Sequence, residues 1–142
     1  MADVHSPETR TRNMAAIRSR NTKPEIAVRR MLHAMGFRFR LRSRLPGRPD
    51  IILPRHRRII FVHGCFWHLH SCRFGQVTPA TRSDFWAQKR AANVARDKKV
   101  LQQLRQEGWR VLVIWECWLR KPDAVSARIR RFLREATSQR MR

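Results

Sequence analysis

The sequence is poor in acidic residues. It has 10 Asp and Glu residues against 32 Lys and Arg residues, which gives a formal net charge of +22 over 142 residues. Such a charge repels itself within the free protein and attracts polyanions. We therefore expect nucleic acid as the partner, with an anionic membrane surface as the alternative.

Long apolar segments are also lacking. Runs such as Ile59–Val62 are far too short to cross a bilayer. Met1 is followed by Ala2-Asp3-Val4-His5 rather than by a basic start and an apolar stretch, so we expect no signal peptide. Three cysteines, an odd number, do not suit a disulfide framework. These absences favour a protein of the reducing cytoplasm with no membrane partner.

The length predicts one domain with a short arm. Residues 1–20 are expected to form an N-terminal arm and a short helix that contact DNA, because the arm is polar with a basic end. Residues 21–142 are expected to form a single domain. No internal repeat divides this part of the chain.

The pattern along the chain predicts an α/β fold. Thr22 and Glu25 form a capping-box start, and apolar residues at helical spacing follow as far as Gly36. Residues 37–42 alternate apolar and basic side chains, which predicts a strand. Further strands are expected over 50–53, 58–63 and 109–115, and helices over 83–107 and 122–136. This order predicts a mixed central sheet flanked by helices, with a parallel strand–helix–strand step.

One carboxylate stands alone in the basic first half of the chain. Asp50 is the one acid between Glu25 and Asp84, and it opens an expected strand directly after Pro49. One interpretation is an ion pair with a nearby arginine, or a turn cap. The other is a Mg²⁺ ligand, because Mg²⁺ needs few carboxylates when phosphate oxygens complete its shell. The neighbouring strand ends near Val62, whose backbone carbonyl can also bind a metal.

The segment that follows is rich in metal-binding side chains. His63–Cys72 contains three histidines and two cysteines. Two thiolates and one imidazole supply three ligands of a structural zinc site, and Cys117 can supply the fourth. The alternative is buried free cysteines beside surface histidines. Spacing leaves open whether His68 or His70 binds zinc, and a spare histidine near a phosphate is a candidate general base.

Aromatic side chains interrupt this polar segment. Phe66 and Trp67 lie inside it, and Phe85 and Trp86 open the long helix. They either cover the zinc site and the core or act as an apolar wedge that unstacks a base step, which is easiest at a mismatch. Met14 is a further candidate wedge beside the basic arm.

The motifs combine into a specific pattern that extends to about Leu119. The runs are Thr11–Met14 with Ala16-Ile17, Thr22–Glu25, Leu45–Asp50, Phe61–His68, Cys72, Pro79–Arg82 with Phe85-Trp86, Asn93-Val94 with Arg96-Asp97, and Gly108–Leu112 with Trp115–Cys117. With these runs the sequence resembles the very-short-patch repair (Vsr) DNA mismatch endonucleases.

The resemblance implies a restriction-endonuclease-like fold with a structural zinc site. It implies a Mg²⁺-dependent endodeoxyribonuclease, a hydrolase acting on phosphodiester bonds. Such an enzyme nicks the thymine strand of double-stranded DNA at T·G mismatches left when 5-methylcytosine deaminates. The resemblance further implies a monomer in the bacterial cytoplasm, associated with the nucleoid when bound to DNA, that acts alongside mismatch-repair proteins.

The resemblance also implies a role for each site residue. Asp50 would hold Mg²⁺ with the main-chain carbonyl of Val62, a position that is commonly Thr in the family. His63 would contact metal-bound water and His68 would activate the attacking water. The acidic residues placed around this site would be Glu25 and Asp97. The zinc ligands would be Cys65, His70, Cys72 and Cys117, and the DNA-intercalating side chains would be Phe66, Trp67, Trp86 and Met14.

Two other classes of function fit parts of the sequence. A zinc-stabilised basic protein that binds distorted nucleic acid without cleavage accounts for the charge, but it gains nothing from Asp50 facing phosphate. A ribosomal or membrane-surface basic protein leaves the Cys/His segment and the Phe66-Trp67 pair without a role.

Overall fold

The computed structural model describes residues 22–41, 44–77, 79 and 81–140, with side chains as far as residue 134. The arm and short helix predicted over residues 1–20, including Met14, lie outside the described residues.

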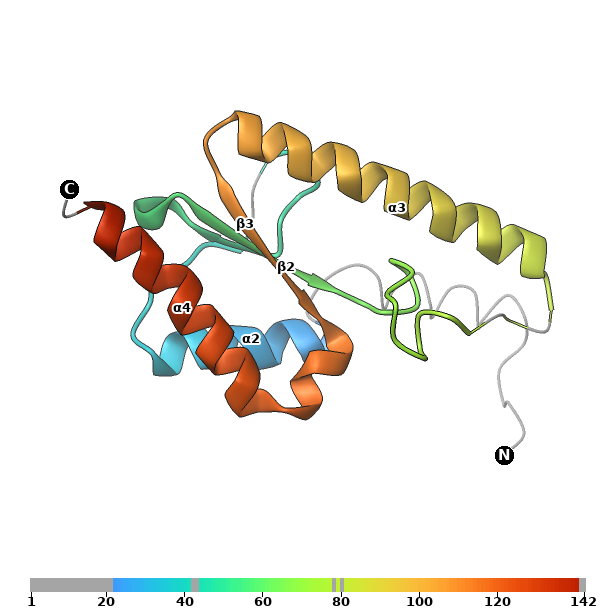
Figure 1. Ribbon diagram of the computed structural model, residues 1–142, viewed down its shortest axis with the longest axis horizontal. Coiled ribbons are helices and arrows are strands. Elements are labelled where there is room, and N and C mark those ends of the chain that lie inside the picture. The colour runs from blue at the N-terminus through green and yellow to red at the C-terminus, as the bar shows by residue number, and fades with distance from the viewer. Residues whose placement is uncertain (1–21, 42–43, 78, 80, 141–142) are drawn as a thin grey trace.

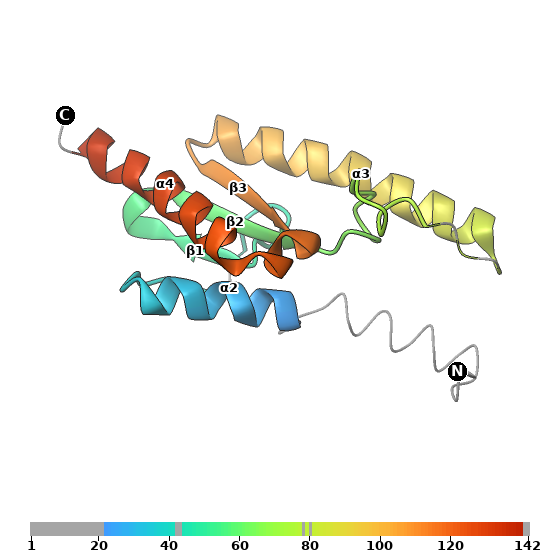
Figure 2. The same cartoon turned by 60° about the horizontal axis from the view of Figure 1, so that its bottom comes forward.

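A three-stranded sheet lies between two layers of helices (Figures 1 and 2). The strand order is β1-β2-β3, with β1 antiparallel to β2 and β2 parallel to β3. Helices α2 and α4 cover one face and α3 covers the other. The mixed sheet flanked by helices is therefore confirmed, and the step from β2 through α3 to β3 is parallel as predicted. The bounds are α2 Lys23–Ala34, β1 Ile51–Leu53, β2 Arg58–His63, α3 Ser83–Gln106, β3 Arg110–Trp115 and α4 Pro122–Arg140, with short 3-10 helices at Pro54–His56 and Glu116–Arg120.

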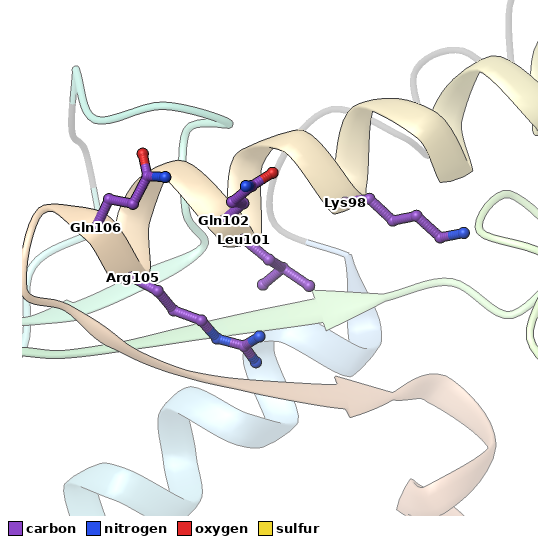
Figure 3. Close-up of a pocket in the computed structure, with 5 residues that line it drawn as sticks. All are labelled: Lys98, Leu101, Gln102, Arg105 and Gln106. Atoms are coloured by element: carbon purple, nitrogen blue, oxygen red, sulfur yellow. The ribbon is translucent and has the colours of Figure 1, made fainter.

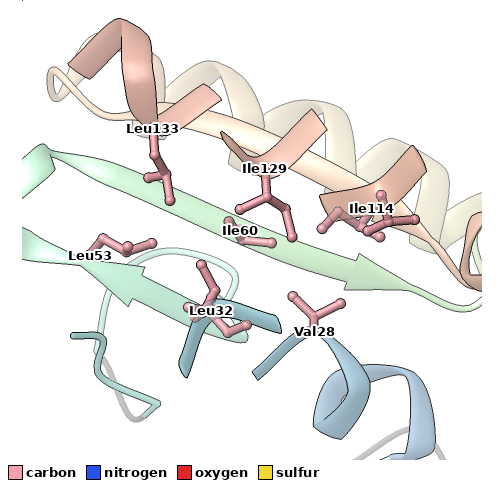
Figure 4. Packing of buried hydrophobic residues seen from close by; sticks show 9 residues of the cluster. Val28, Leu32, Leu53, Ile60, Ile114, Ile129 and Leu133 are labelled. Carbon is pink, nitrogen blue, oxygen red and sulfur yellow. The ribbon is translucent and has the colours of Figure 1, made fainter. Parts of the chain in front are cut away.

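Alternate residues of the strands face the two helical layers. Ile60 in β2 belongs to the core under α2 and α4, whereas its neighbours Ile59 and Phe61 pack toward α3. The first core is drawn in Figure 4 and consists of Val28, Leu32, Ile51, Leu53, Ile60, Ile114, Val125, Ile129 and Leu133. Because both faces are covered, the strands are almost continuously apolar, and the sheet is a rigid platform for the residues at its ends.

Helix α2 begins and ends where its sequence predicts. The Thr22 side chain accepts a hydrogen bond of 3.4 Å from the backbone N–H of Glu25, and a proline lies in the first turn. Gly36 follows the helix with a φ of +83°, a conformation that glycine adopts without steric strain. Val28 and Leu32 on one side of the helix are fully buried.

The strand predicted over residues 37–42 is wrong. Within the described part of this segment, only Arg40 pairs, through an isolated antiparallel bridge to Ile52. The alternation itself is real, because Phe37 and Phe39 pack against the core while Arg38 and Arg40 are exposed. Strand β1 is only three residues long, so it offers too short an edge for a full fourth strand. It also begins at Ile51, one residue later than predicted.

No helix in the described ranges is both long enough and apolar enough to cross a membrane.

Candidate functional site

The lone carboxylate lies where the first two strands meet. The Asp50 Oδ2 atom accepts a hydrogen bond of 2.7 Å from the backbone N–H of Val62 in β2. The N–H and C=O of one strand residue point toward the same neighbouring strand, so the Val62 carbonyl also faces this side. Among the described residues Asp50 has no ion pair with an arginine, which was the other interpretation of its place in the sequence.

Asp50 is poorly hydrated. Burial raises the pKa of Asp50 to about 7, against the lowering effect of the Val62 N–H, and the negative charge of Glu25 raises it further. Glu25 is only 5% exposed and forms an ion pair of 3.2 Å with Arg29. A bound cation would relieve the repulsion between two carboxylates and favour the ionised form of Asp50. The donors and their burial therefore fit a hard divalent cation.

Two histidines stack at the end of β2. His63 is the last residue of β2 and its ring lies parallel to that of His68, with centroids 3.8 Å apart. Burial lowers the pKa of His63 to about 4, and the nearby His68 lowers it further. The Nδ1 atom of His63 is buried and has no hydrogen-bond partner within the described part of the chain. His63 is therefore neutral at physiological pH.

His68 is oriented by a carboxylate from α3. Its Nδ1 atom lies 2.6 Å from Oδ2 of Asp97. A carboxylate at this nitrogen holds the ring proton on Nδ1 and leaves Nε2 as the proton acceptor. Potential ligand atoms of His63, His68 and Asp97 all lie within 4.8 Å of one another. This arrangement suits a general base whose protonated form is stabilised by a neighbouring carboxylate.

The second polar cluster joins two distant segments. Ligand atoms of Cys65, His70, Cys72 and Cys117 lie within 4.8 Å of one another. The Sγ atom of Cys117 lies 3.5 Å from Nδ1 of His70, and its backbone N–H donates to Sγ of Cys65. Sequence spacing left His68 and His70 as alternatives for this cluster, and the structure places His70 in it and His68 beside Asp97.

The donor set of the cysteine cluster fits a metal that prefers sulfur and nitrogen. Burial raises the pKa of the Cys65 thiol to about 12. For Cys72, burial acts in the same direction, but the Gly75 N–H and the His70 side chain outweigh it and lower the pKa to about 6. Three sulfurs and one imidazole in a closed group are the donors of a structural tetrahedral site.

Three of the four predicted wedge residues form one aromatic group. The ring centroids of Phe66 and Trp67 are 5.2 Å apart, and those of Trp67 and Trp86 are 5.4 Å apart. Trp86 is 8% exposed, whereas the other two rings are half-buried. In this form Trp86 supports the two rings that lie nearer the surface.

Helix α3 contacts three successive residues of this segment. The Nε atom of Arg90 donates to the carbonyl of Phe66 (2.7 Å), and Nδ2 of Asn93 donates to the carbonyl of Trp67 (3.1 Å). Asp97 then binds His68, as described above. Sequence reasoning missed Arg90 and gave no role to Asn93, which lies in one of the matched runs. Their positions four and seven residues after Trp86 were the available signal, because this spacing puts all of these side chains on one helix face.

A separate pocket lies along the second half of α3 (Figure 3). It contains none of the predicted site residues, and its lining consists of Lys98, Leu101, Gln102, Arg105 and Gln106.

Known proteins are similar to this chain in sequence, and a solved structure is similar to it in fold. The model of the family DNA mismatch endonuclease Vsr matches residues 2–74. The Type II nicking enzyme V.XorIIP of Xanthomonas oryzae pv. oryzae is 52% identical over 134 residues, covering 94% of this chain and 98% of the relative. DNA mismatch endonuclease Vsr of Escherichia coli K12 is 48% identical over 121 residues, covering 84% and 77%. The catalytic domain of the homing endonuclease I-Bth0305I has a TM-score of 0.58 and 25% identity, covering 82% of this chain and 98% of that domain.

Proposed function

Because the chain belongs to the DNA mismatch endonuclease Vsr family and is a DNA endonuclease, we propose that it nicks the thymine strand at T·G mismatches by Mg²⁺-dependent hydrolysis. We propose double-stranded DNA with mismatches from 5-methylcytosine deamination as the substrate. In this proposal the fold is restriction-endonuclease-like, residues 21–142 form one endonuclease domain, and residues 1–20 contact DNA. The enzyme acts as a monomer in the bacterial cytoplasm, at the nucleoid and alongside mismatch-repair proteins.

The single observation that supports cleavage is that Asp50, His63, His68 and Asp97 form one connected group at the end of β2. Asp50 binds the backbone of Val62, His63 follows Val62 and stacks on His68, and His68 bonds to Asp97. Asp50 and the Val62 carbonyl are the proposed Mg²⁺ ligands, with Glu25 beside them. When bound, Mg²⁺ supplies positive charge that stabilises the negative charge developing on the phosphate oxygens. A protein that only binds DNA has no use for this arrangement.

In the proposed reaction His68 is the general base. Its Nε2 atom removes a proton from water while the water oxygen attacks phosphorus and the bond to the leaving sugar oxygen breaks. Asp97 keeps the other ring proton on Nδ1 and stabilises the imidazolium that forms. His63, which burial keeps neutral, orients water at the site through a hydrogen bond. The base is thus aligned before DNA binds.

Mismatch preference is assigned to the aromatic group. Phe66 and Trp67, supported by Trp86, form the proposed wedge, and Met14 is the proposed contact from the other groove. Inserting apolar rings between base pairs costs a few kcal/mol of stacking, and the cost is smallest where pairing is already weakened. Structural zinc at Cys65, His70, Cys72 and Cys117 would hold residues 66–77, which we call the wedge segment, against the end of β3.

A nicking assay on three otherwise identical duplexes tests the proposal. With Mg²⁺ present, the T·G duplex should be nicked in its thymine strand, while the C·G and T·A duplexes should stay largely intact. Equal nicking of all three duplexes would contradict mismatch specificity. Nicking of the T·G duplex in excess chelator would contradict the Mg²⁺ mechanism.

A further inference from the structure

The guanidinium group of Arg90 binds the backbone of its own protein. Arg90 is 5% exposed, and its donors point at backbone carbonyls within residues 66–77, the segment that carries the aromatic pair. Its Nε donates to Phe66 at 2.7 Å, its Nη1 donates to Val77 at 2.8 Å, and its Nη2 donates to Gly75. One guanidinium group therefore joins both ends of this segment to α3, which runs beside it in Figure 1.

The same guanidinium also fixes an aromatic ring. Its central carbon lies 4.2 Å from the centroid of the Phe66 ring, which is a cation–π contact. Burial lowers the pKa of Arg90, so the protein holds this charge away from water. Charge-assisted hydrogen bonds to carbonyls offset that loss of hydration. The arrangement needs a planar fork of donors, which arginine has and lysine lacks.

The contacts of Arg90 reach the part of the segment beyond the cysteine cluster. The cluster fixes the chain at Cys65, His70 and Cys72, but it leaves residues 73–77 to other contacts. Gly75 packs so tightly against His70 that a Cβ atom there would collide with the His70 backbone. By binding the Gly75 carbonyl, Arg90 therefore supports the backbone of His70 as well as that of Phe66.

We propose that Arg90 is a positioning residue that holds the Phe66–Trp67 wedge in its inserting form before DNA binds, and thereby sets the preference for a mismatch. The inference rests on the proposed mismatch function. Phosphate contacts give affinity that is independent of sequence, whereas only insertion distinguishes a weakened base pair from a sound one. A wedge that must first be ordered loses insertion energy, so selectivity falls more than affinity.

The test compares Arg90→Lys and Arg90→Met with Arg105→Lys in the full chain. Arg105 lies near the other end of the same helix and is exposed (Figure 3), so its change controls for an altered arginine on α3. Single-turnover nicking rates on T·G and C·G duplexes give the selectivity ratio, and titration of the C·G duplex gives the general affinity. Both Arg90 variants should lower the ratio by about tenfold or more with little change in that affinity. The control should keep both values.

Hydrogen exchange separates positioning from general loss of structure. In Arg90→Lys, amides of residues 66–77 should exchange faster while those of β2 and β3 remain protected. A wild-type selectivity ratio in Arg90→Lys, or a loss of affinity and protection throughout the chain, would overturn the role of Arg90. A wild-type protein that nicks T·G and C·G duplexes equally would instead overturn the proposed function. If Arg90→Met does not fold, Arg90→Lys alone decides the question.

Discussion

The imidazole rings of His63 and His68 lie parallel, 3.8 Å apart between centroids and with 4° between their planes. They differ in their partners, because His68 bonds to Asp97 whereas Nδ1 of His63 has no hydrogen-bond partner among the described residues. Burial keeps His63 neutral, so the ring that stacks on His68 has no charge. The pair can therefore divide the work, with one ring orienting water and the other accepting its proton.

Asp97→Asn should slow nicking by about a hundredfold at pH 7.5, because the amide does not hold the His68 tautomer or stabilise its protonated form. The substitution keeps the size of the side chain, so affinity for the T·G duplex should change little. Single-turnover rates measure the effect, and Asp123→Asn, on the exposed first turn of α4, is the matched control. An unchanged rate would remove Asp97 from the catalytic group.

Protons and Mg²⁺ should compete for Asp50. Its pKa of about 7 means that the carboxyl is protonated in acid and must lose the proton before it binds a cation. At limiting Mg²⁺ the nicking rate should rise with pH around a midpoint near 7. Once Mg²⁺ exceeds its dissociation constant for the ionised site, each further tenfold increase should move that midpoint down by about one pH unit. His63, with a pKa of about 4, is neutral over this range. A midpoint that does not change with the Mg²⁺ concentration would rule out competition between protons and Mg²⁺ for Asp50.

Asp50→Asn should abolish nicking and stabilise the metal-free protein at alkaline pH. The folded pKa of Asp50 lies above its ordinary value of 3.8, so the wild-type protein loses stability as the pH rises from about 4 to 7. Asparagine does not ionise, so the variant does not lose this stability as the pH rises. Its side-chain oxygen can still accept a hydrogen bond from the Val62 N–H. We expect the variant to be more stable by about 2 kcal/mol at pH 8 and equal to wild type near pH 4.

Urea unfolding without divalent cations measures this difference in stability. Asp84→Asn, which removes an exposed carboxylate, is the control and should change stability little at either pH. Titration of His63 acts in both proteins and cancels from the difference between them. An Asp50→Asn variant less stable than wild type at pH 8, or one that still nicks DNA, would contradict the assigned role of Asp50.

Removal of the metal from the cysteine cluster should loosen the wedge segment. We expect about one zinc per chain in protein purified without chelator, and a lower unfolding temperature after chelation. His70→Ala should reduce the zinc content, whereas His33→Ala, an exposed histidine on α2, should leave it unchanged. Protein that contains no zinc, yet unfolds at the same temperature with and without chelator, would argue that the cysteines are simply buried thiols.

Replacement of both Phe66 and Trp67 by alanine should weaken the preference for T·G more than the affinity for a matched duplex. The rings contribute insertion energy, while the phosphate contacts of a chain with a charge of +22 remain. Competition binding with T·G and C·G duplexes measures both quantities. Leu41→Ala, which removes an exposed apolar side chain outside the aromatic group, is the control. Equal loss of affinity for both duplexes would point to a packing role.

The helices and the core strands could be predicted from local patterns. The Thr22 cap, the period of apolar residues in α2 and the apolar runs of β2 and β3 are properties of short stretches of chain. The strand expected over residues 37–42 failed because strand formation also needs a long enough neighbour, and the three-residue β1 does not provide one. Alternation reports which side chains face the core but not whether the backbone finds a partner.

The candidate site was predictable only as far as residue chemistry allows. Asp50 stood out because acids are rare around it, and the Cys/His segment stood out by composition. The division of His68 and His70 between two clusters depends on which distant residue each meets, namely Asp97 or Cys117, and spacing contains no such information. Arg90 was missed because its spacing from Trp86 indicates a shared helix face but not that its guanidinium group binds backbone carbonyls of a distant segment.

The spacing of polar side chains along α3 fixes the proposed wedge relative to the proposed general base. Arg90, Asn93 and Asp97 form hydrogen bonds with three consecutive residues, 66–68. These bonds can form together only if the three side chains point to the same side of the helix. One residue inserted between Asn93 and Asp97 would turn the carboxylate by about 100° relative to the two donors before it. Such an insertion would misalign the proposed wedge and the proposed general base even if every side chain were still present. We therefore expect this stretch of α3 to tolerate substitutions far better than changes in length.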